Sequence, residues 1–401
     1  MTKYRNEAST RKELIDQQLA RAGWKVSDPS QVELELAVHY GVTKADTIRE
    51  ESSPARHEFI DYALLDSTGI PLAVVEAKRE GRDALAGKRQ AEDYARSIKA
   101  IHQRDPFIFL TNGHEIWFYE WGYAPPRKVS GFFTRNDLER LRFQRENRTV
   151  ISNQVPKRSI VDRPYQIEAV KRVAEGLEQG KRKFLLVMAT GTGKTRTVIA
   201  LIDLLMRNNW VHRVLFLADR RELVSQALGD FKEHMPNETR ARIESGQVDH
   251  TARIHVATYP SMVQVYQNLS PGYYDLIVAD ESHRSIYNRY KVLFDYFDAY
   301  QLGLTATPTD YIDHNTFELF DCPDGLPTFN YAYETAVEEE YLAQYRVLEA
   351  QTTFQIEGIR AGQLPPEIQR QLEAQGIELS EIDFEGSDLE RRVTNTGTTH
   401  A

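Results

Sequence analysis

The 401-residue sequence has one cysteine and no apolar run approaching the roughly 18 residues of a membrane-spanning helix. Cys322 cannot form an internal disulfide, and it has no cysteine or histidine neighbours at zinc-ligand spacing. We therefore expect a structural thiol and no zinc site. The first residues are polar and lack the apolar core of an export signal, which predicts a cytoplasmic protein.

A strong excess of positive charge is also missing, since 50 basic residues face 59 acidic ones and the net charge is -9. This balance argues against a protein that simply coats nucleic acid, although individual clefts can still be basic. A basic-leaning stretch at residues 157–183 fits a solvated helix face at least as well as a DNA track. The length predicts two or three domains.

Residues 1–150 read as a compact α/β domain. Two apolar runs, 59–65 and 72–77, flank a turn-rich segment at 66–69 and predict an antiparallel hairpin. Helices are expected at 11–22 and 83–101, and further strands at 107–111 and 115–120.

Beyond a polar connector at residues 140–159, the pattern changes to short, continuous apolar runs alternating with helices. Such runs are typical of a parallel sheet that is covered on both faces. The expected strands are 184–188, 214–218, 254–257, 276–279 and 301–304. We place a second domain at residues 151–310, and an extension with a polar, coreless ending at 311–401.

The most specific motif is the run from Met188 to Thr195, which follows an apolar strand and opens a helix. Its glycines, Gly191 and Gly193, let the backbone curl so that N–H groups, that of Thr192 included, point at phosphates. Lys194 is expected to reach the β- and γ-phosphates, and the Thr195 hydroxyl to complete a magnesium shell. The run therefore predicts a P-loop for Mg-ATP, although Met188 replaces the first glycine of the strict pattern.

A strand about 85 residues further on delivers Asp280 and Glu281. Two adjacent acids at a strand end are usually part of a solvated loop, but alongside a P-loop they suit Mg-ATP chemistry. Asp280 is expected to hold magnesium, and Glu281 to position or deprotonate the attacking water.

The remaining elements resemble those of superfamily 2 helicases and follow in the same order. Gln166 resembles the glutamine that binds adenine, and residues 216–223 and 258–259 resemble segments that grip the nucleic-acid backbone. Thr305 and Thr307 resemble the hydroxyls that meet the loop containing His283 and couple nucleotide to nucleic acid. The resemblance implies a RecA-like lobe with a parallel sheet.

In the first domain, Asp61 lies in one hairpin strand and Glu76 and Lys78 end the other. Residues two apart in a strand share a face, so a carboxylate and an ammonium are expected beside Asp61. This layout resembles a PD-(D/E)xK nuclease, in which the two acids, Asp61 and Glu76, bind Mg²⁺. Lys78 would orient the attacking water or offset charge on the phosphate.

Acids and lysines at strand ends often arise by chance, so the interpretation needs further support. Gln90 and Tyr94 stand at i and i+4 on the next helix, as in nucleases with a Q-x-x-x-Y helix, although they could form only a core hydrogen bond. An acid from an earlier helix commonly joins such sites. Glu33 and Glu35 are both candidates.

The succession of 59–62, 74–79, 90–94, 111–113 and 188–195 resembles the R subunit of type I restriction enzymes. The resemblance implies a partnership with methylation and sequence-specificity subunits, ATP-driven pulling of double-stranded DNA, and cleavage away from the recognition site.

No second RecA-like lobe is recognisable after residue 308, which predicts a fragment that binds nucleotide, hydrolyses it poorly and cannot translocate DNA. Two alternatives stay open. One is a stand-alone superfamily 2 helicase-nuclease of type III restriction or DNA repair, which the nuclease-first order disfavours. The other is a nucleotide-gated DNA-binding module without catalysis.

Overall fold

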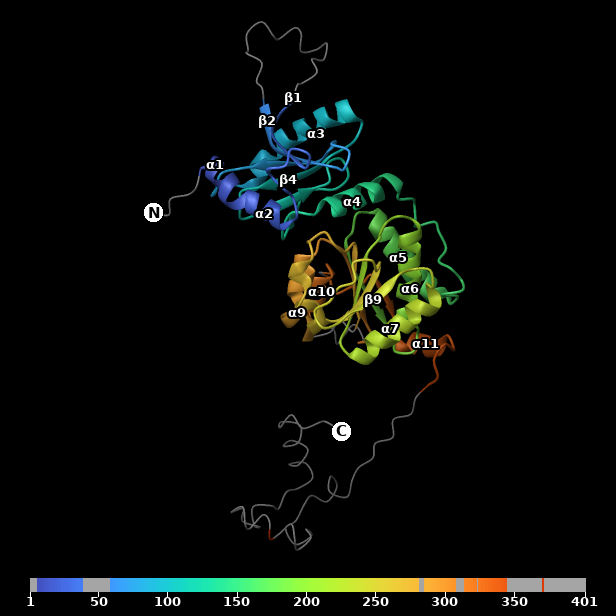
Figure 1. Cartoon of the computed structure of the whole chain (residues 1–401). Coiled ribbons are helices and arrows are strands. Elements are labelled where there is room, and N and C mark those ends of the chain that lie inside the picture. The colour runs from blue at the N-terminus through green and yellow to red at the C-terminus, as the bar shows by residue number, and fades with distance from the viewer. Residues whose placement is uncertain are drawn as a thin grey trace. The chain divides into compact units, whose positions relative to one another are not determined.

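A computed structural model describes residues 6–38, 58–280, 285–307, 314–322, 324–344 and 370. The chain divides into two compact units, Met1–Leu342 and Ala343–Ala401, and the two sheets both belong to the first (Figure 1). Within the described ranges, no helix is both long and apolar enough to cross a membrane.

The first sheet has six strands in sequence order, all antiparallel to their neighbours except for the parallel pair β3 and β4. The strands are β1 Val32–Val38, β2 Glu58–Leu65, β3 Pro71–Ala77, β4 Phe107–Thr111, β5 Ile116–Tyr119 and β6 Arg127–Val129. The predicted hairpin is confirmed as β2 and β3. Its turn is held by Asp66, whose Oδ1 accepts hydrogen bonds from the backbone N–H groups of Thr68 and Ile70.

Helices cover both faces of this sheet. On one face, Val75 and Ala77 pack with Ile15 and Leu19 of the N-terminal helical segment. That segment comprises α1 Glu7–Thr10, the π-helix η1 Arg11–Ile15 and α2 Asp16–Arg21. On the other face Val74 packs against α3 Lys88–His102, which follows the 3₁₀-helix η2 Ala84–Gly87. The helix predicted at 83–101 is therefore two helices of different type.

The two acids expected on an early helix are not helical. Glu33 and Glu35 belong to β1, which pairs antiparallel with β2. Leu34 pairs with Tyr62 and Leu36 with Ile60, so the register is unbroken and Glu35 stands opposite Asp61; its φ is 52°. The expectation of a helix-borne acid at these positions was wrong, because the alternating Val-Glu-Leu-Glu-Leu run is a strand pattern.

The second sheet consists of seven parallel strands in the order β13-β7-β12-β11-β8-β10-β9, which confirms the RecA-like α/β lobe. Its strands are β7 Lys183–Met188, β8 Val214–Ala218, β9 Arg240–Ile243, β10 Ile254–Thr258, β11 Leu276–Ala279, β12 Tyr300–Thr305 and β13 Phe329–Tyr331. The two edge strands, β9 and β13, were not predicted.

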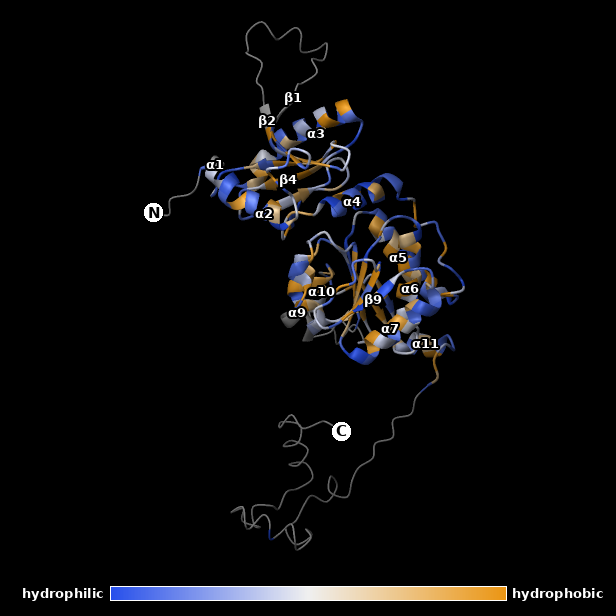
Figure 2. Ribbon diagram, viewed as in Figure 1, coloured by the Kyte–Doolittle hydropathy of each residue, from blue (hydrophilic) through white to orange (hydrophobic). Residues whose placement is uncertain are grey.

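Alternate side chains of the central strands enter two hydrophobic layers. Leu186 and Phe216 pack under one set of helices, and Leu185 and Leu217 pack under the other. The first set is α5 Pro164–Glu178, α6 Lys194–Arg207 and α7 Arg221–His234; the second is α8 Tyr259–Val263, α9 Ser285–Tyr296 and α10 His314–Leu319. Figure 1 shows α5 to α7 on the opposite side of the sheet from α9 and α10, and Figure 2 shows the apolar strands between them. The short helices η3 Tyr266–Asn268 and α11 Tyr333–Glu338 complete the lobe.

Two expected boundaries differ from the structure. β13 pairs with β7, so the sheet continues past residue 310 into the segment expected to be an extension. The segment expected to be a polar connector begins inside a helix, α4 Arg135–Asn147, which a Thr134–Asp137 capping box starts.

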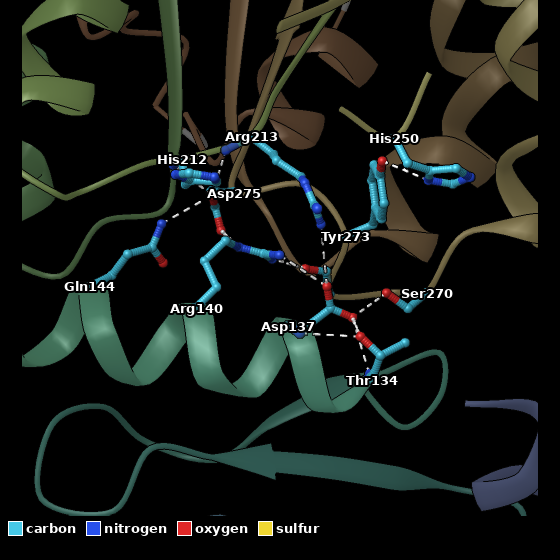
Figure 3. A network of polar contacts seen from close by, with 11 residues as sticks. Thr134, Asp137, Arg140, Gln144, His212, Arg213, His250, Ser270, Tyr273 and Asp275 are labelled. Atoms are coloured by element: carbon cyan, nitrogen blue, oxygen red, sulfur yellow. Dashed lines mark hydrogen bonds and ion pairs between the residues drawn. The ribbon is translucent and has the colours of Figure 1, made fainter. Parts of the chain in front are cut away.

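α4 joins the first sheet to the second through polar contacts (Figure 3). Asp137 accepts a hydrogen bond from Ser270, and Arg140 donates one to the Gly272 carbonyl and another to Asp275. Each side chain of the Asp137, Arg140 and Asp275 group is less than a tenth exposed. The buried face of α4 is therefore polar and contacts the second domain, and we call α4 the docking helix.

Candidate functional site

The hairpin of β2 and β3 brings three predicted nuclease residues together. Asp61 Oδ2 accepts a hydrogen bond of 2.8 Å from the backbone N–H of Ala77, the residue between Glu76 and Lys78. Lys78 Nζ lies 2.5 Å from Glu76 Oε1. Two carboxylates and an ammonium thus meet where β3 ends.

The helix α3 supplies the other two predicted residues of this cluster. Lys78 Nζ donates to Gln90 Oε1 at 3.2 Å, and Gln90 Nε2 donates to the Tyr94 hydroxyl at 2.5 Å. Because Tyr94 is fully buried, it gives Gln90 a fixed support, and Gln90 in turn orients Lys78.

Gly87 allows the 3₁₀-helix η2 to pass close over this cluster. A Cβ atom at that position would lie 2.5 Å from Glu76 Cγ and 3.1 Å from Lys78 Cε. Contacts this short force the neighbouring side chains to shift, so any larger residue at position 87 would disturb both groups.

The two carboxylates of the cluster are buried, with Glu76 2% and Asp61 8% exposed. Burial strengthens their interactions with nearby charges. A residue that the sequence did not indicate, Arg11, lies 2.9 Å from Asp61 Oδ1 and 3.2 Å from Glu35 Oε1. Burial alone would lower the pKa of Arg11, but the charge of Asp61 and the hydrogen bond to Glu35 outweigh it and raise that pKa. Arg11 is 50 residues from Asp61 in sequence, so no local motif could have revealed it.

The donor set of the cluster fits magnesium. Mg²⁺ prefers oxygen ligands and is commonly held by one or two carboxylates, with water and substrate phosphate completing its shell. Asp61 and Glu76 provide that number. Among the described residues, no group of three or more acidic, histidine or cysteine side chains is arranged to hold a metal ion.

The P-loop connects β7 to α6, which begins at Lys194. Gly191 and Gly193 have φ angles of +86° and +83°, a region that side-chain-bearing residues rarely adopt. Between them, the Thr192 hydroxyl donates to the Ala189 carbonyl at 2.6 Å and closes the turn. The loop thereby turns the unsatisfied N–H groups of the first helical turn toward an anion.

Two side chains of α5 hold this loop from behind. The Tyr165 hydroxyl and Gln166 Nε2 both donate to the Thr192 carbonyl, at 2.8 and 3.0 Å. The ring of Tyr165 stacks on Tyr331 of β13 with centroids 3.9 Å apart. Gln166, predicted as an adenine ligand, is thus 4% exposed and bonded to the P-loop, and Tyr165 is a loop support that the motif contained but the sequence analysis did not single out.

A cavity of about 430 Å³ lies beside the P-loop. It is lined by Gly191, Gly193, Lys194, Thr195 and Arg196, and from α7 by Gln226, Asp230, Glu233 and His234. The described lining thus includes four of the five predicted phosphate-loop residues; Thr192 is buried below it.

Asp280 follows β11 and is 9% exposed. Its N–H donates to the Leu217 carbonyl at 2.8 Å, and its own carbonyl accepts from the Tyr259 hydroxyl at 3.2 Å. These bonds fix the backbone at the end of β11. In the sheet, β11 is adjacent to β12, and β12 is adjacent to β7, the strand that leads into the P-loop. Glu281 and His283, the predicted water-positioning and coupling residues, lie outside the described residues.

The coupling threonines are at the end of β12. Thr305 is 1% exposed, and its Oγ1 accepts from the N–H of Thr307 at 3.0 Å. Tyr259 belongs to a segment expected to grip nucleic acid, and its side chain is fully buried and stacks on Tyr290, so a contact by this segment would have to come from other atoms. Thr258 caps α8 through the N–H of Ser261.

Two family models match the chain. "Type I restriction enzyme R protein N terminus" matches residues 53–127, and "Type III restriction enzyme, res subunit" matches residues 159–310. The first therefore overlaps the carboxylate–lysine cluster, and the second overlaps the P-loop lobe.

Curated relatives align with most of this chain. The chain is 31% identical to the type I restriction enzyme EcoAI endonuclease subunit of Escherichia coli, over 75% of this chain and 39% of the relative. It is 29% identical to the EcoKI endonuclease subunit of Escherichia coli strain K12, over 82% of this chain and 34% of the relative. Among solved structures, the Pyrococcus furiosus Hef helicase domain aligns at 23% identity with 48% of this chain and 43% of that chain, with a TM-score of 0.37. The chain thus spans less than two fifths of the curated relatives' length, and over that span it belongs to the family of type I restriction enzyme R subunits.

Proposed function

We propose that this chain carries the nuclease and the first ATP-binding lobe of a type I restriction enzyme. In this proposal it cleaves phosphodiester bonds of double-stranded DNA with Mg²⁺, and it contributes its ATP-binding lobe to the ATP-driven DNA translocation of the larger enzyme. It would work with methylation and specificity subunits, as its family implies. The R-subunit family and the RecA-like fold support this proposal, and the convergence of Asp61, Glu76, Lys78 and Gln90 is the observation that carries its nuclease part.

Asp61 and Glu76 are the proposed metal ligands of the nuclease. Bound Mg²⁺ would lower the pKa of the attacking water and polarise the scissile phosphate. Lys78, with three N–H donors at the end of a partly buried stem, would orient that water and offset the charge that develops on the phosphate. Gln90 limits the positions of Lys78 Nζ, so the donor is directed before substrate arrives.

At the second site, the N–H groups of the P-loop and the ammonium of Lys194 would bind the phosphates of ATP. Thr195 and Asp280 are the proposed ligands of the magnesium ion that accompanies ATP, and they supply hard oxygen atoms suited to it. Glu281 is the proposed group that positions the attacking water. Gln166 is the proposed adenine ligand, and its bond to the Thr192 carbonyl connects it to the P-loop.

The nuclease assignment is tested with supercoiled plasmid, Mg²⁺ and the full chain. We expect the Asp61→Ala, Glu76→Ala and Lys78→Ala variants each to lose nicking by at least about a hundredfold. Glu146→Ala, which removes an exposed carboxylate from α4, should nick like the unchanged chain. Equal nicking by all four variants would refute the assignment.

A further inference from the structure

Arg11 is bonded to Asp61, one of the two proposed metal ligands of the nuclease. Its guanidinium donates through Nη1 to Asp61 Oδ1 at 2.9 Å and through Nη2 to Glu35 Oε1 at 3.2 Å. The other oxygen of Asp61 accepts the N–H of Ala77. Both oxygens of this proposed metal ligand therefore already have a donor.

The helical segment that carries Arg11 is anchored to the ends of two central strands. Thr10 Oγ1 accepts from the N–H of Glu80, just past β3, at 3.1 Å. Gln18 Nε2 donates to the carbonyl of Gly113, just past β4, at 2.9 Å. Leu14 packs so closely on Gly113 that a Cβ there would lie 2.7 Å from its Cδ1. The packing of this segment thus places the Arg11 side chain beside Asp61, and that side chain is only 24% exposed.

The backbone at Arg11 is a single turn of π-helix, residues Arg11–Ile15. Single π-helical turns are frequent at functional sites. Here the first residue of the turn is a cation whose guanidinium contacts a proposed metal ligand. The ring of Tyr62 lies beneath the guanidinium at 5.7 Å, and its hydroxyl donates to Asp16 at 2.7 Å, which fixes the ring.

Charge favours a competition between this guanidinium and a metal ion. The carboxylates of Asp61, Glu76 and Glu35 face the cations of Lys78 and Arg11, so the group carries a net charge near -1 with Arg11 and near -2 without it. A divalent ion binds more weakly to the former because the guanidinium both repels it and occupies Asp61 Oδ1. Glu35, 66% exposed, holds the other arm of the same guanidinium and can keep it when Asp61 is released.

We infer that the Arg11 guanidinium stays bonded to the Asp61 carboxylate until a divalent metal ion displaces it toward Glu35. This competition sets the metal concentration at which the nuclease site binds its ion. The inference rests on the proposed nuclease function and adds a regulator to the same site.

The test measures Ca²⁺ binding to the full chain by calorimetry without DNA, so that no cleavage is involved. Arg11→Met keeps the apolar stem over Tyr62 and removes the charge, and we expect it to bind Ca²⁺ roughly tenfold more tightly. Lys12→Met makes the same charge change one residue away, on an exposed side chain, and should stay within about twofold of the unchanged chain. Unchanged or weaker binding by Arg11→Met would overturn the inference.

Two further variants separate this inference from the proposed function. Asp61→Asn should abolish the Ca²⁺ binding event; if it does not, the proposed metal site itself is wrong. Glu35→Gln should weaken Ca²⁺ binding in the unchanged chain and have a clearly smaller effect in the Arg11→Met background, because its role acts through the guanidinium. An equal effect in both backgrounds would show that Glu35 acts independently and would contradict the displacement of Arg11 toward it.

Discussion

Arg140 and Asp275 are 135 residues apart in sequence and form a buried ion pair, with Arg140 Nε 3.2 Å from Asp275 Oδ1. The other carboxylate oxygen, Oδ2, accepts from the backbone N–H groups of His212 and Arg213 and from Gln144 Nε2, at 2.7, 2.8 and 3.0 Å. Asp275 precedes β11, the strand whose far end presents Asp280. The docking helix α4 is therefore bonded to the residue that precedes β11 (Figure 3). β11 is the strand that ends at the proposed ATP site.

The first prediction is that Arg140→Ala lowers the free energy of unfolding by about 3 kcal/mol, because it leaves the buried carboxylates of Asp137 and Asp275 without their shared cation. Urea denaturation measures the loss. Arg172→Ala breaks an ion pair of similar length, 2.7 Å to Glu168, but both side chains are exposed. That control should change stability little, and equal losses in the two variants would contradict a structural role for the buried pair.

The same pair explains why sequence reasoning missed α4. Hydrophobic periodicity detects helices that bury apolar faces, but the buried residues of α4 are Asp137, Leu138, Gln144 and Arg145. Asp137 and Gln144 bond to Ser270 and Asp275 of the second domain, and Arg145 donates to the Asp105 carbonyl of the first; none of these partners has a fixed spacing from α4. By contrast, β7 and β8 are continuous apolar runs, and both were predicted to within one residue at each end. The edge strands β9 and β13 are short and partly exposed, which left them without such a run.

The second prediction concerns pH and His255, a fully buried side chain of β10. Burial lowers the pKa of His255 below its ordinary value of 6.5, although the carbonyl of Asp249 opposes the shift. In the unfolded chain the imidazole titrates at about 6.5. Below that pH the unfolded chain binds more protons than the folded one, so the stability contributed by His255 is complete above pH 6.5 and is lost as the pH falls.

Urea midpoints measured between pH 7.5 and 5.5 should therefore fall with decreasing pH, and His255→Gln should fall less steeply. The slope with pH is the quantity compared, whatever the starting stability of the variant. A His255→Gln slope as steep as that of the unchanged chain would show that another group titrates.

The third prediction follows the chain of hydrogen bonds from Lys78 through Gln90 to Tyr94. Tyr94→Phe removes one hydroxyl from a buried ring and should cost about 1 kcal/mol of stability. It also releases Gln90, so Mg²⁺-dependent nicking should fall about tenfold while ATP binding stays unchanged.

A double-mutant cycle distinguishes positioning from a general loss of structure. If Tyr94 acts through Lys78, Tyr94→Phe should have little further effect on nicking in a Lys78→Met background. Fully additive losses would mean that Tyr94 contributes by another route.

The contacts of the proposed nuclease residues could largely be predicted from the sequence, because most of these residues are close together along the chain. Glu76 and Lys78 are two apart on one strand, and Gln90 and Tyr94 are four apart on one helix, so strand and helix periodicity indicate which face each pair occupies. Arg11 has no such relationship to Asp61. Its place depends on how the N-terminal helices pack across the sheet, and packing of that kind leaves no local pattern.

The last prediction compares two glycines with nearly the same backbone. Gly193 in the P-loop and Gly180 after α5 have φ angles of +83° and +85°, so alanine costs roughly 1–2 kcal/mol of backbone strain at either position. Their surroundings differ, because a Cβ at Gly193 would lie 2.5 Å from Gln166 Nε2, whereas a Cβ at Gly180 meets nothing within 4 Å.

Gly193→Ala must therefore push Gln166 off the Thr192 carbonyl and deform the loop. We expect both variants to lose similar thermal stability, but only Gly193→Ala to lose binding of a fluorescent ATP analogue, by at least about tenfold. Matching affinities in the two variants would mean that the contact with Gln166 does not shape the nucleotide site.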